Sequence, residues 1–198
     1  MHYLNAEELR KLIEVTAKRS KRDLAMIVLS LRHGLRASEV CSLTLEDVDE
    51  ANKRLIVVAK KTRKKNGEKF YEVFMPKDDL AASDLTLIHA WLKEREHYTA
   101  AKTSPVLFLS RKRGAMLPRS WFKVFQGIAR EAGLRPEACH PHVLRHTLAM
   151  QNVKSNMPLP AVSRTMRHHS IASLTPYVQI QQDEADRQKA RAIAKWDL

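Results

Sequence analysis

The sequence is poor in the residues on which several common protein classes depend. Its 2 cysteines, Cys41 and Cys139, are too few and too far apart for a disulfide framework, which favours a reducing cytoplasm. Its 5 glycines exclude broad glycine-rich phosphate loops. No apolar run approaches the ~20 residues of a membrane span. The opening segment MHYLNAEELRKL also lacks the apolar stretch of a signal peptide.

Acidic residues are also in short supply. The chain has 22 Asp and Glu against 35 Lys and Arg, which gives a formal net charge of +13. A charge of this size attracts polyanions and speeds encounter with them. No strongly basic amphipathic helix is visible, so an acidic membrane surface is a poor candidate. We therefore favour nucleic acid as the partner over the alternative of a merely basic, soluble protein.

The hydrophobic pattern is mostly that of helices. The 198 residues show no repeat, low-complexity tract or linker, so we expect one domain over residues 1–198. Asn5 is predicted to open the first helix, with Glu8 as its capping-box partner. Gly34 is predicted to end the second helix. The remaining helices are predicted around residues 37–41, 87–92, 121–132, 142–154, 158–167 and about 180–195.

One segment has the pattern of strands. The apolar runs 55–58 and 70–75 flank a lysine-rich stretch that ends in Asn66-Gly67, the dipeptide that a two-residue hairpin turn prefers. We therefore predict a hairpin with a basic tip. The fold class is mainly α with a small antiparallel β-sheet, α+β.

Four clusters could carry chemistry, although each alone is also typical of a solvated surface. They are Gly34–Glu39, the hairpin segment 60–65, the run His140–His146, and Arg167-His168-His169 with Tyr177 nine residues after His168. His142 and His146 have the spacing of zinc-protease ligands, but Val143 stands where that motif needs Glu, and Arg145 would repel a cation. We therefore predict no metal and no cofactor. No G-x-S-x-G elbow and no Walker A motif is present.

Taken together, the clusters suit phosphoryl transfer from DNA without metal or ATP. Arginine binds two phosphate oxygens at once through its planar fork. A tyrosine phenol can act as a covalent nucleophile, and a lysine or histidine can protonate the leaving 5′-oxygen. A phosphotyrosyl bond would conserve the energy of the bond that is broken.

In these clusters the sequence resembles the catalytic domain of the tyrosine recombinases, the phage integrase family. The segment 34–40 is similar to the first arginine box, and His142-Val143-Leu144-Arg145-His146 matches the H-x-L-R-H box. Met166-Arg167-His168 stands where the family usually has L-G-H, and Tyr177 follows at the expected distance. The resemblance runs from Leu4 to about residue 180 and implies the same fold.

The resemblance also implies roles for individual residues. Arg36 and Arg145 would clamp the scissile phosphate, His142 would assist proton transfer, and His168 would hydrogen-bond the phosphate. Tyr177 would attack, leaving a 3′-phosphotyrosyl link and a free 5′-hydroxyl. Lys61 is our choice for the general acid, with Lys60 the alternative. Glu39 would support Arg36 or His142, and His146 would support helix packing. DNA contacts are expected from Lys60, Arg63, Lys64 and Lys65.

The chain departs from the family pattern in three places. Arg167 replaces the common glycine, and Pro176 precedes Tyr177 where a basic or polar residue is usual. The chain also has no room for the N-terminal core-binding domain of most members, so it resembles the small fimbrial phase-variation recombinases. A truncated chain, or a partner that supplies the missing half, is the alternative.

We therefore expect a site-specific DNA recombinase of the cytoplasm, associated with the nucleoid. It would be a monomer in solution and a homotetramer on double-stranded DNA, with accessory DNA-bending proteins as further partners. The tail after Tyr177, about residues 180–198, would dock on a neighbouring subunit. The alternatives are a DNA-binding accessory protein that has lost cleavage, and a type IB topoisomerase.

Overall fold

Helices account for most of the chain in a computed structural model that describes residues 2–57, 59–65, 68–74, 77–111, 114–167 and 174–193. The predicted class, mainly α with short antiparallel strands, is confirmed. In chain order the elements are α1 (Ala6–Arg19), α2 (Lys21–Arg32), α3 (Ala37–Ser42), β1 (Val48–Asp49), β2 (Arg54–Ile56), β3 (Ala59–Lys65), β4 (Glu68–Phe74), β5 (Lys77–Asp79), α4 (Ala82–Arg95), the 3₁₀ turn η1 (Thr99–Lys102), β6 (Leu109–Ser110), β7 (Gly114–Ala115), α5 (Pro118–Glu131), the 3₁₀ turn η2 (Pro136–Ala138), α6 (His142–Lys154), α7 (Leu159–Thr165) and α8 (Thr175–Ile193).

The helix boundaries follow from local capping. The side chain of Asn5 accepts a hydrogen bond from the Glu8 amide at 2.9 Å, and the Glu8 carboxylate accepts one from the Asn5 amide, so the predicted capping box at α1 is confirmed. Gly34 follows the end of α2 with a φ of +57°, the left-handed conformation that glycine adopts at no steric cost. The prediction for α6 is also confirmed, whereas α8 begins at Thr175, five residues earlier than predicted.

The strand prediction was wrong about which segments pair. We expected residues 55–58 to pair with 70–75, but β2 pairs instead with β1 and β5, and the lysine-rich stretch is itself the strand β3 opposite β4. Leu55 and Val57 are fully buried, so their burial holds that segment in the body of the molecule. Lys65 is opposite Glu68, which leaves two residues for the connection. Those two, Asn66 and Gly67, lie outside the described residues.

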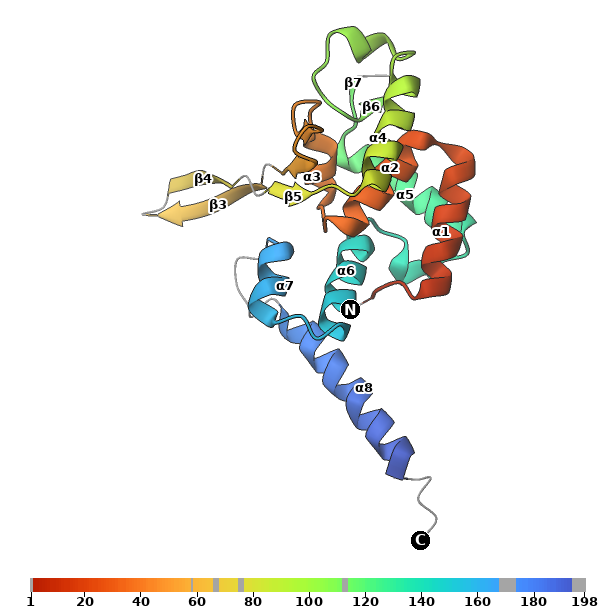
Figure 1. Cartoon of the computed structure of the whole chain (residues 1–198), viewed down its shortest axis with the longest axis vertical. Coiled ribbons are helices and arrows are strands. Elements are labelled where there is room, and N and C mark those ends of the chain that lie inside the picture. Colours follow the sequence, from red (N-terminus) through yellow and green to blue (C-terminus); the bar gives the residue numbers. More distant parts are fainter. Residues whose placement is uncertain are drawn as a thin grey trace.

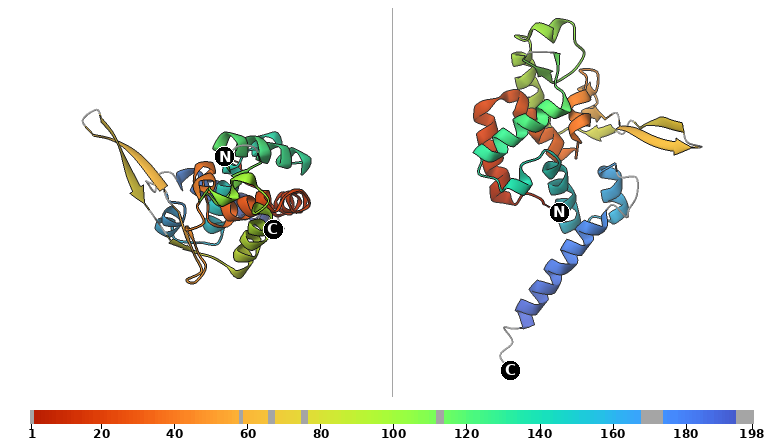
Figure 2. Two further views of the ribbon diagram at one scale, coloured as in Figure 1. Left: turned by 90° about the horizontal axis from the view of Figure 1, so that it is seen from above. Right: turned by 180° about the vertical axis from the view of Figure 1, so that it is seen from behind.

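Two parts extend away from the packed body. The β3–β4 hairpin projects to one side, and the distal part of α8 projects in another direction (Figures 1 and 2).

Among the described helices, none combines the length and apolar composition of a membrane span. The strands β1, β5, β6 and β7 were not predicted, because two or three residues are too short to show a period.

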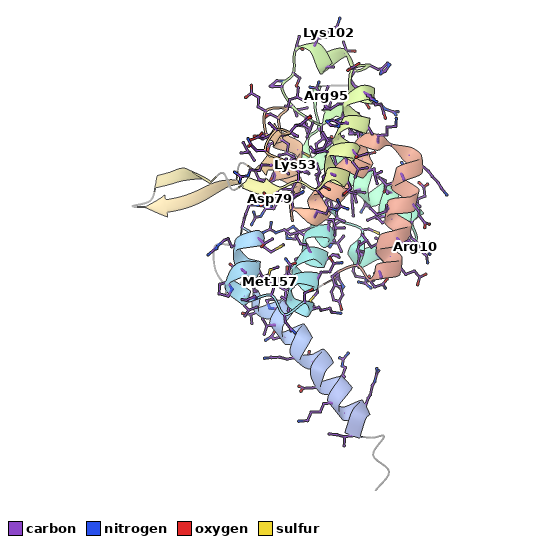
Figure 3. The ribbon with its side chains drawn as sticks, viewed as in Figure 1. Arg10, Lys53, Asp79, Arg95, Lys102 and Met157 are labelled. Carbon is purple, nitrogen blue, oxygen red and sulfur yellow. The ribbon has the colours of Figure 1, made fainter. Side chains whose placement is uncertain are left out.

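The buried apolar residues form two clusters. The larger contains Trp91, Phe108, Trp121 and Phe125 and joins α1–α6 and the small strands. The smaller joins α6, α7 and α8; its buried members are Ala149, Met150, Val153, Val162, Met166, Leu174 and Tyr177. Met157, which is labelled in Figure 3 where these three helices meet, packs against it. The smaller cluster therefore fixes the position of Tyr177.

Candidate active site

Arg36 lies at the N-terminus of α3, in the turn that follows α2. The Glu39 carboxylate accepts hydrogen bonds from the Arg36 backbone amide at 2.8 Å and from its Nη1 at 2.7 Å. The Arg36 side chain is about one-third exposed, whereas that of Glu39 is buried. Burial acts to raise the pKa of Glu39, but the hydrogen bonds from Arg36 and the charges of Arg167 and Arg36 outweigh it, so the pKa is lowered. Glu39 is therefore an anion that holds Arg36, one of the two roles expected for it.

The second arginine joins this turn to α7. Arg145, on α6, donates from Nη1 to the carbonyl of Gly34 at 2.5 Å and from Nη2 to the carbonyl of Met166. A Cβ on Gly34 would lie 3.2–3.3 Å from the ends of the Leu148 and Met166 side chains, and the φ of +57° would strain any residue with a Cβ, so both observations favour glycine there. Arg145 is only 1% exposed. Burial, and after it the charge of Arg36, lower the pKa of Arg145 to about 9, which still leaves it cationic at neutral pH.

Tyr177 lies in the first turns of α8 and contacts the histidines of α6. Its hydroxyl and His146 Nδ1 are joined by a hydrogen bond of 2.6 Å, and the ring of His142 meets that of His146 edge-on at 4.6 Å between centroids. We expected His146 only to support helix packing; the structure places it against the predicted nucleophile. Tyr177 is 2% exposed.

The same environment keeps all three side chains neutral. Burial raises the pKa of Tyr177, and the charge of Arg145 only partly offsets it. Burial, followed by the neighbouring His142, lowers the pKa of His146 to about 3. Desolvation and then the charge of Arg145 lower the pKa of His142. The site therefore combines cationic arginines with a neutral phenol and neutral imidazoles.

The remaining predicted site residues are described by their backbone alone or lie outside the described part of the chain. His168 lies outside the described residues. For Lys60, Lys61, Arg63, Lys64 and Lys65 the structure describes the backbone of β3. Lys60 is opposite Val73 and Lys61 opposite Glu72 on β4, so the two candidates for the general acid occupy successive positions on opposite faces of the hairpin.

Three residues at the site were not predicted as functional. Arg167 belongs to one of the four predicted clusters but has no predicted role beyond its departure from the family pattern, and the sequence does not single out Asp78 or His33. Arg167 donates from Nη1 to Asp78 Oδ2 at 2.9 Å and from Nη2 to the carbonyl of His33 at 2.6 Å. The sequence signal that could have found Arg167 is the substitution of a common glycine by a large charged residue.

Among the described residues, no group of three or more His, Cys, Asp or Glu side chains is arranged to hold a metal ion. The charged groups gathered at the site are instead the guanidinium groups of Arg36, Arg145 and Arg167, with the carboxylates of Glu39 and Asp78. Three guanidinium groups against two carboxylates leave a positive charge near the phenol, which suits an anionic substrate such as a phosphodiester.

This helical fold, with the buried Arg145 near the partly exposed Arg36 and a tyrosine from the last helix, is the fold of a tyrosine recombinase catalytic domain. A sequence model of the phage integrase family matches residues 2–184, and the chain belongs to that family.

Individual relatives cover most of the chain. The type 1 fimbriae regulatory protein FimE of Escherichia coli (strain K12) is 24% identical over 177 residues, 88% of this chain and 84% of FimE. The tyrosine recombinase XerA of Pyrococcus furiosus is 28% identical over 180 residues, 89% of this chain and 57% of XerA. Among solved structures, the post-cleavage complex of the XerH site-specific recombinase with its palindromic difH substrate superposes with a TM-score of 0.73 at 25% identity, over 100% of this chain and 54% of XerH. The chain thus spans little more than half of the length of these Xer recombinases.

Proposed function

We propose that this protein is a site-specific DNA recombinase that cuts and rejoins double-stranded DNA through Tyr177. The observation that carries the proposal is the joint burial of Tyr177 and Arg145, which brings a phenol hydroxyl and a guanidinium into one cluster with Arg36 and His142. XerH and the Tn1549 transposon integrase have been solved with DNA, which supports double-stranded DNA as the partner here. A DNA substrate also fits a position in the cytoplasm, at the nucleoid.

The chemical step follows from the groups present. Arg36 and Arg145 bind the non-bridging oxygens of the scissile phosphate and offset the negative charge that develops there. The Tyr177 oxygen attacks phosphorus, so one P–O bond forms to the phenol and the bond to the 5′-oxygen breaks. His142 assists removal of the phenol proton, Lys61 or Lys60 protonates the 5′-oxygen, and His168 hydrogen-bonds the phosphate. Rejoining is the reverse step with a new 5′-hydroxyl.

We propose that the conformation described here precedes DNA engagement. Tyr177 and Arg145 are almost fully buried, and the Tyr177 hydroxyl is bonded to His146. We propose that Tyr177 leaves His146 when the arginines take up a phosphate, because its oxygen must then face phosphorus. His146 therefore holds the nucleophile in the resting enzyme.

The wider assembly is part of the same proposal. Five of the seven residues of β3 are basic, and we propose that Lys60, Arg63, Lys64 and Lys65 contact the DNA backbone. A single catalytic domain would bind as a monomer to each half-site and assemble as a homotetramer, with accessory DNA-bending proteins as further partners. Residues beyond about 180 would dock on the neighbouring subunit.

The experiment that tests this function uses nicked suicide duplexes tiled from DNA that flanks the gene. Denaturing gels score covalent adducts for wild type, Tyr177→Phe and the control Tyr3→Phe. We expect an adduct with wild type and Tyr3→Phe and none with Tyr177→Phe, since only Tyr177 supplies the attacking oxygen.

The other outcomes identify the alternatives. Tight binding by all three proteins without any adduct would indicate a DNA-binding accessory protein. Relaxation of supercoiled plasmid without preference for a site would indicate a type IB topoisomerase.

A further inference from the structure

Arg167 combines two features that are costly for an arginine. Its side chain is only 2% exposed, and burying a guanidinium is unfavourable unless it is paired and hydrogen-bonded. Its φ is +50°, a left-handed conformation that is uncommon for a residue with a Cβ, at a position where the family usually has glycine. Such a residue persists only where its surroundings hold it firmly.

The contacts of its guanidinium join three segments. Nη1 binds the Asp78 carboxylate on β5 at 2.9 Å, and Nη2 binds the His33 carbonyl at the end of α2 at 2.6 Å. Nη2 is also 3.6 Å from Glu39 Oε2 on α3. The planar fork of arginine can satisfy these partners together, which an ammonium group on a lysine cannot do with the same geometry.

Both hydrogen-bond partners of the Arg36 guanidinium are linked to Arg167. The carbonyl of Arg167 accepts a hydrogen bond from Arg36 Nη2 at 3.4 Å, while Glu39, which contacts the Arg167 guanidinium, accepts from Arg36 Nη1. Arg36 therefore lies between an oxygen of Arg167 itself and a carboxylate that Arg167 orients. The Asp78 carboxylate binds the Arg167 guanidinium, so the contacts run from Asp78 through Arg167 and Glu39 to Arg36.

We propose that Arg167 is a positioning residue that holds the Arg36 guanidinium in the geometry needed to bind the scissile phosphate, with Asp78 as its anchor. The inference rests on the proposed role of Arg36. A purely structural ion pair between Arg167 and Asp78 would stabilise the fold without acting through Arg36, and the two roles differ in what they predict for double variants.

The first test compares single-turnover cleavage of the nicked duplex by Arg167→Met, Arg167→Lys and Asp78→Asn. Because a displacement of about 1 Å in a catalytic group can cost on the order of 100-fold in rate, we expect Arg167→Met to cleave roughly 10- to 100-fold more slowly. Arg167→Lys should recover only part of the loss, and Asp78→Asn should lose less than Arg167→Met. Arg164→Met, the same change at an exposed position of α7, is the matched control and should leave the rate unchanged.

The second test places Arg167→Met in an Arg36→Lys background. A residue that acts through the Arg36 guanidinium has nothing left to position there, so the double variant should cleave at the rate of Arg36→Lys alone. If instead the two losses multiply, Arg167 supports the fold independently of Arg36 and the inference is overturned. Should Arg167→Met fail to fold in a thermal melt, Asp78→Asn, whose side chain is partly exposed, takes its place in the same cycle.

The third test needs no DNA and so separates failure of this inference from failure of the proposed function. Nitrogen-15 NMR of the arginine side chains should show restricted rotation of the Arg36 guanidinium in wild type and Arg164→Met, and faster rotation in Arg167→Met. Unchanged Arg36 signals in a folded Arg167→Met protein would refute the inference. Absence of a Tyr177-dependent adduct with wild type would instead refute the proposed function.

Discussion

Tyr177 and His146 are each kept neutral by the site that they share. Burial raises the pKa of the phenol, while burial and the neighbouring His142 lower the pKa of His146 to about 3. A base this weak does not take the phenol proton at neutral pH, so their 2.6 Å hydrogen bond holds the tyrosine without ionising it. If Tyr177 is the nucleophile, as we propose, it would be activated by moving toward the arginines, where positive charge favours the phenolate.

The depressed pKa of His146 predicts a pH-dependent stability. Its ordinary value is about 6.5, so between roughly pH 3 and pH 6.5 the unfolded chain binds the proton and the folded chain does not. The free energy of unfolding should therefore fall as the pH is lowered through this window, with His146 contributing at most about 1.4 kcal/mol per pH unit. Urea denaturation of wild type and His146→Asn between pH 7 and pH 5 measures the difference.

The control for this prediction is His97→Asn, a change at an exposed histidine next to α4. It should keep the wild-type slope, whereas His146→Asn should flatten it. Equal slopes for wild type and His146→Asn would show that the proton uptake on unfolding occurs at another group.

The sequence predicted the candidate site where its members lie in short motifs. Arg36 and Glu39 are three residues apart and bind each other as that spacing allows on one helical turn. The contacts of Arg167 with Asp78 and with the His33 carbonyl span 89 and 134 residues, and no local pattern encodes such a pairing. The left-handed φ of Arg167 is likewise a product of tertiary contacts.

Among the elements, the hairpin shows why local strand patterns are ambiguous. The apolar run at residues 55–58 and the basic run at 59–65 could each form the first strand, and hydrophobicity favours the former. The burial of Leu55 and Val57 in the larger core decides the competition, because it leaves the basic run free to pair with β4. Helix boundaries were easier to predict because the capping residues Asn5 and Gly34 act locally.

The register of β3 bears on the proposed general acid. Since Lys60 and Lys61 are successive positions of the strand, we expect only one of them to reach the leaving group. We expect Lys61→Ala to slow cleavage of a normal duplex and to cleave a duplex with a 5′-bridging sulfur at close to the wild-type rate, because a thiolate leaves without protonation. Suicide-substrate assays with both duplexes measure this.

Lys60→Ala is the matched control on the neighbouring position. This variant should bind DNA more weakly and cleave the oxygen-bridged and sulfur-bridged duplexes with the same loss of rate. If the sulfur-bridged duplex restores the cleavage rate of Lys60→Ala but not that of Lys61→Ala, Lys60 is the general acid. If it restores neither rate, a histidine is the general acid.

Across the whole molecule, the candidate site lies between the two apolar clusters. The helix α6 contributes Val143 and Leu144 to the larger cluster and Met150 and Val153 to the smaller one, and Arg145 stands between them. The turn with Arg36 follows α2, on the larger cluster, whereas Tyr177 belongs to the smaller cluster. Any shift of α7 and α8 relative to the body would therefore change the distance from Tyr177, the proposed nucleophile, to Arg36.

This arrangement makes α8 the natural route by which one subunit could influence another. The described side chains of α8 from position 182 onward are exposed, including Ile193 at 50%, and no other described element lies beside the distal helix (Figure 3). Among the described residues, the last buried member of the smaller cluster is Tyr177, so deleting residues 182–198 should leave the fold and the cleavage of a single half-site intact. If the tail docks on a neighbour, the deletion should abolish cooperative binding to duplexes with two half-sites, measured by titration in native gels, and Ile193→Asp should weaken it. Cooperativity equal to that of wild type in the deletion variant would remove the docking proposal and place subunit contacts elsewhere on the catalytic domain.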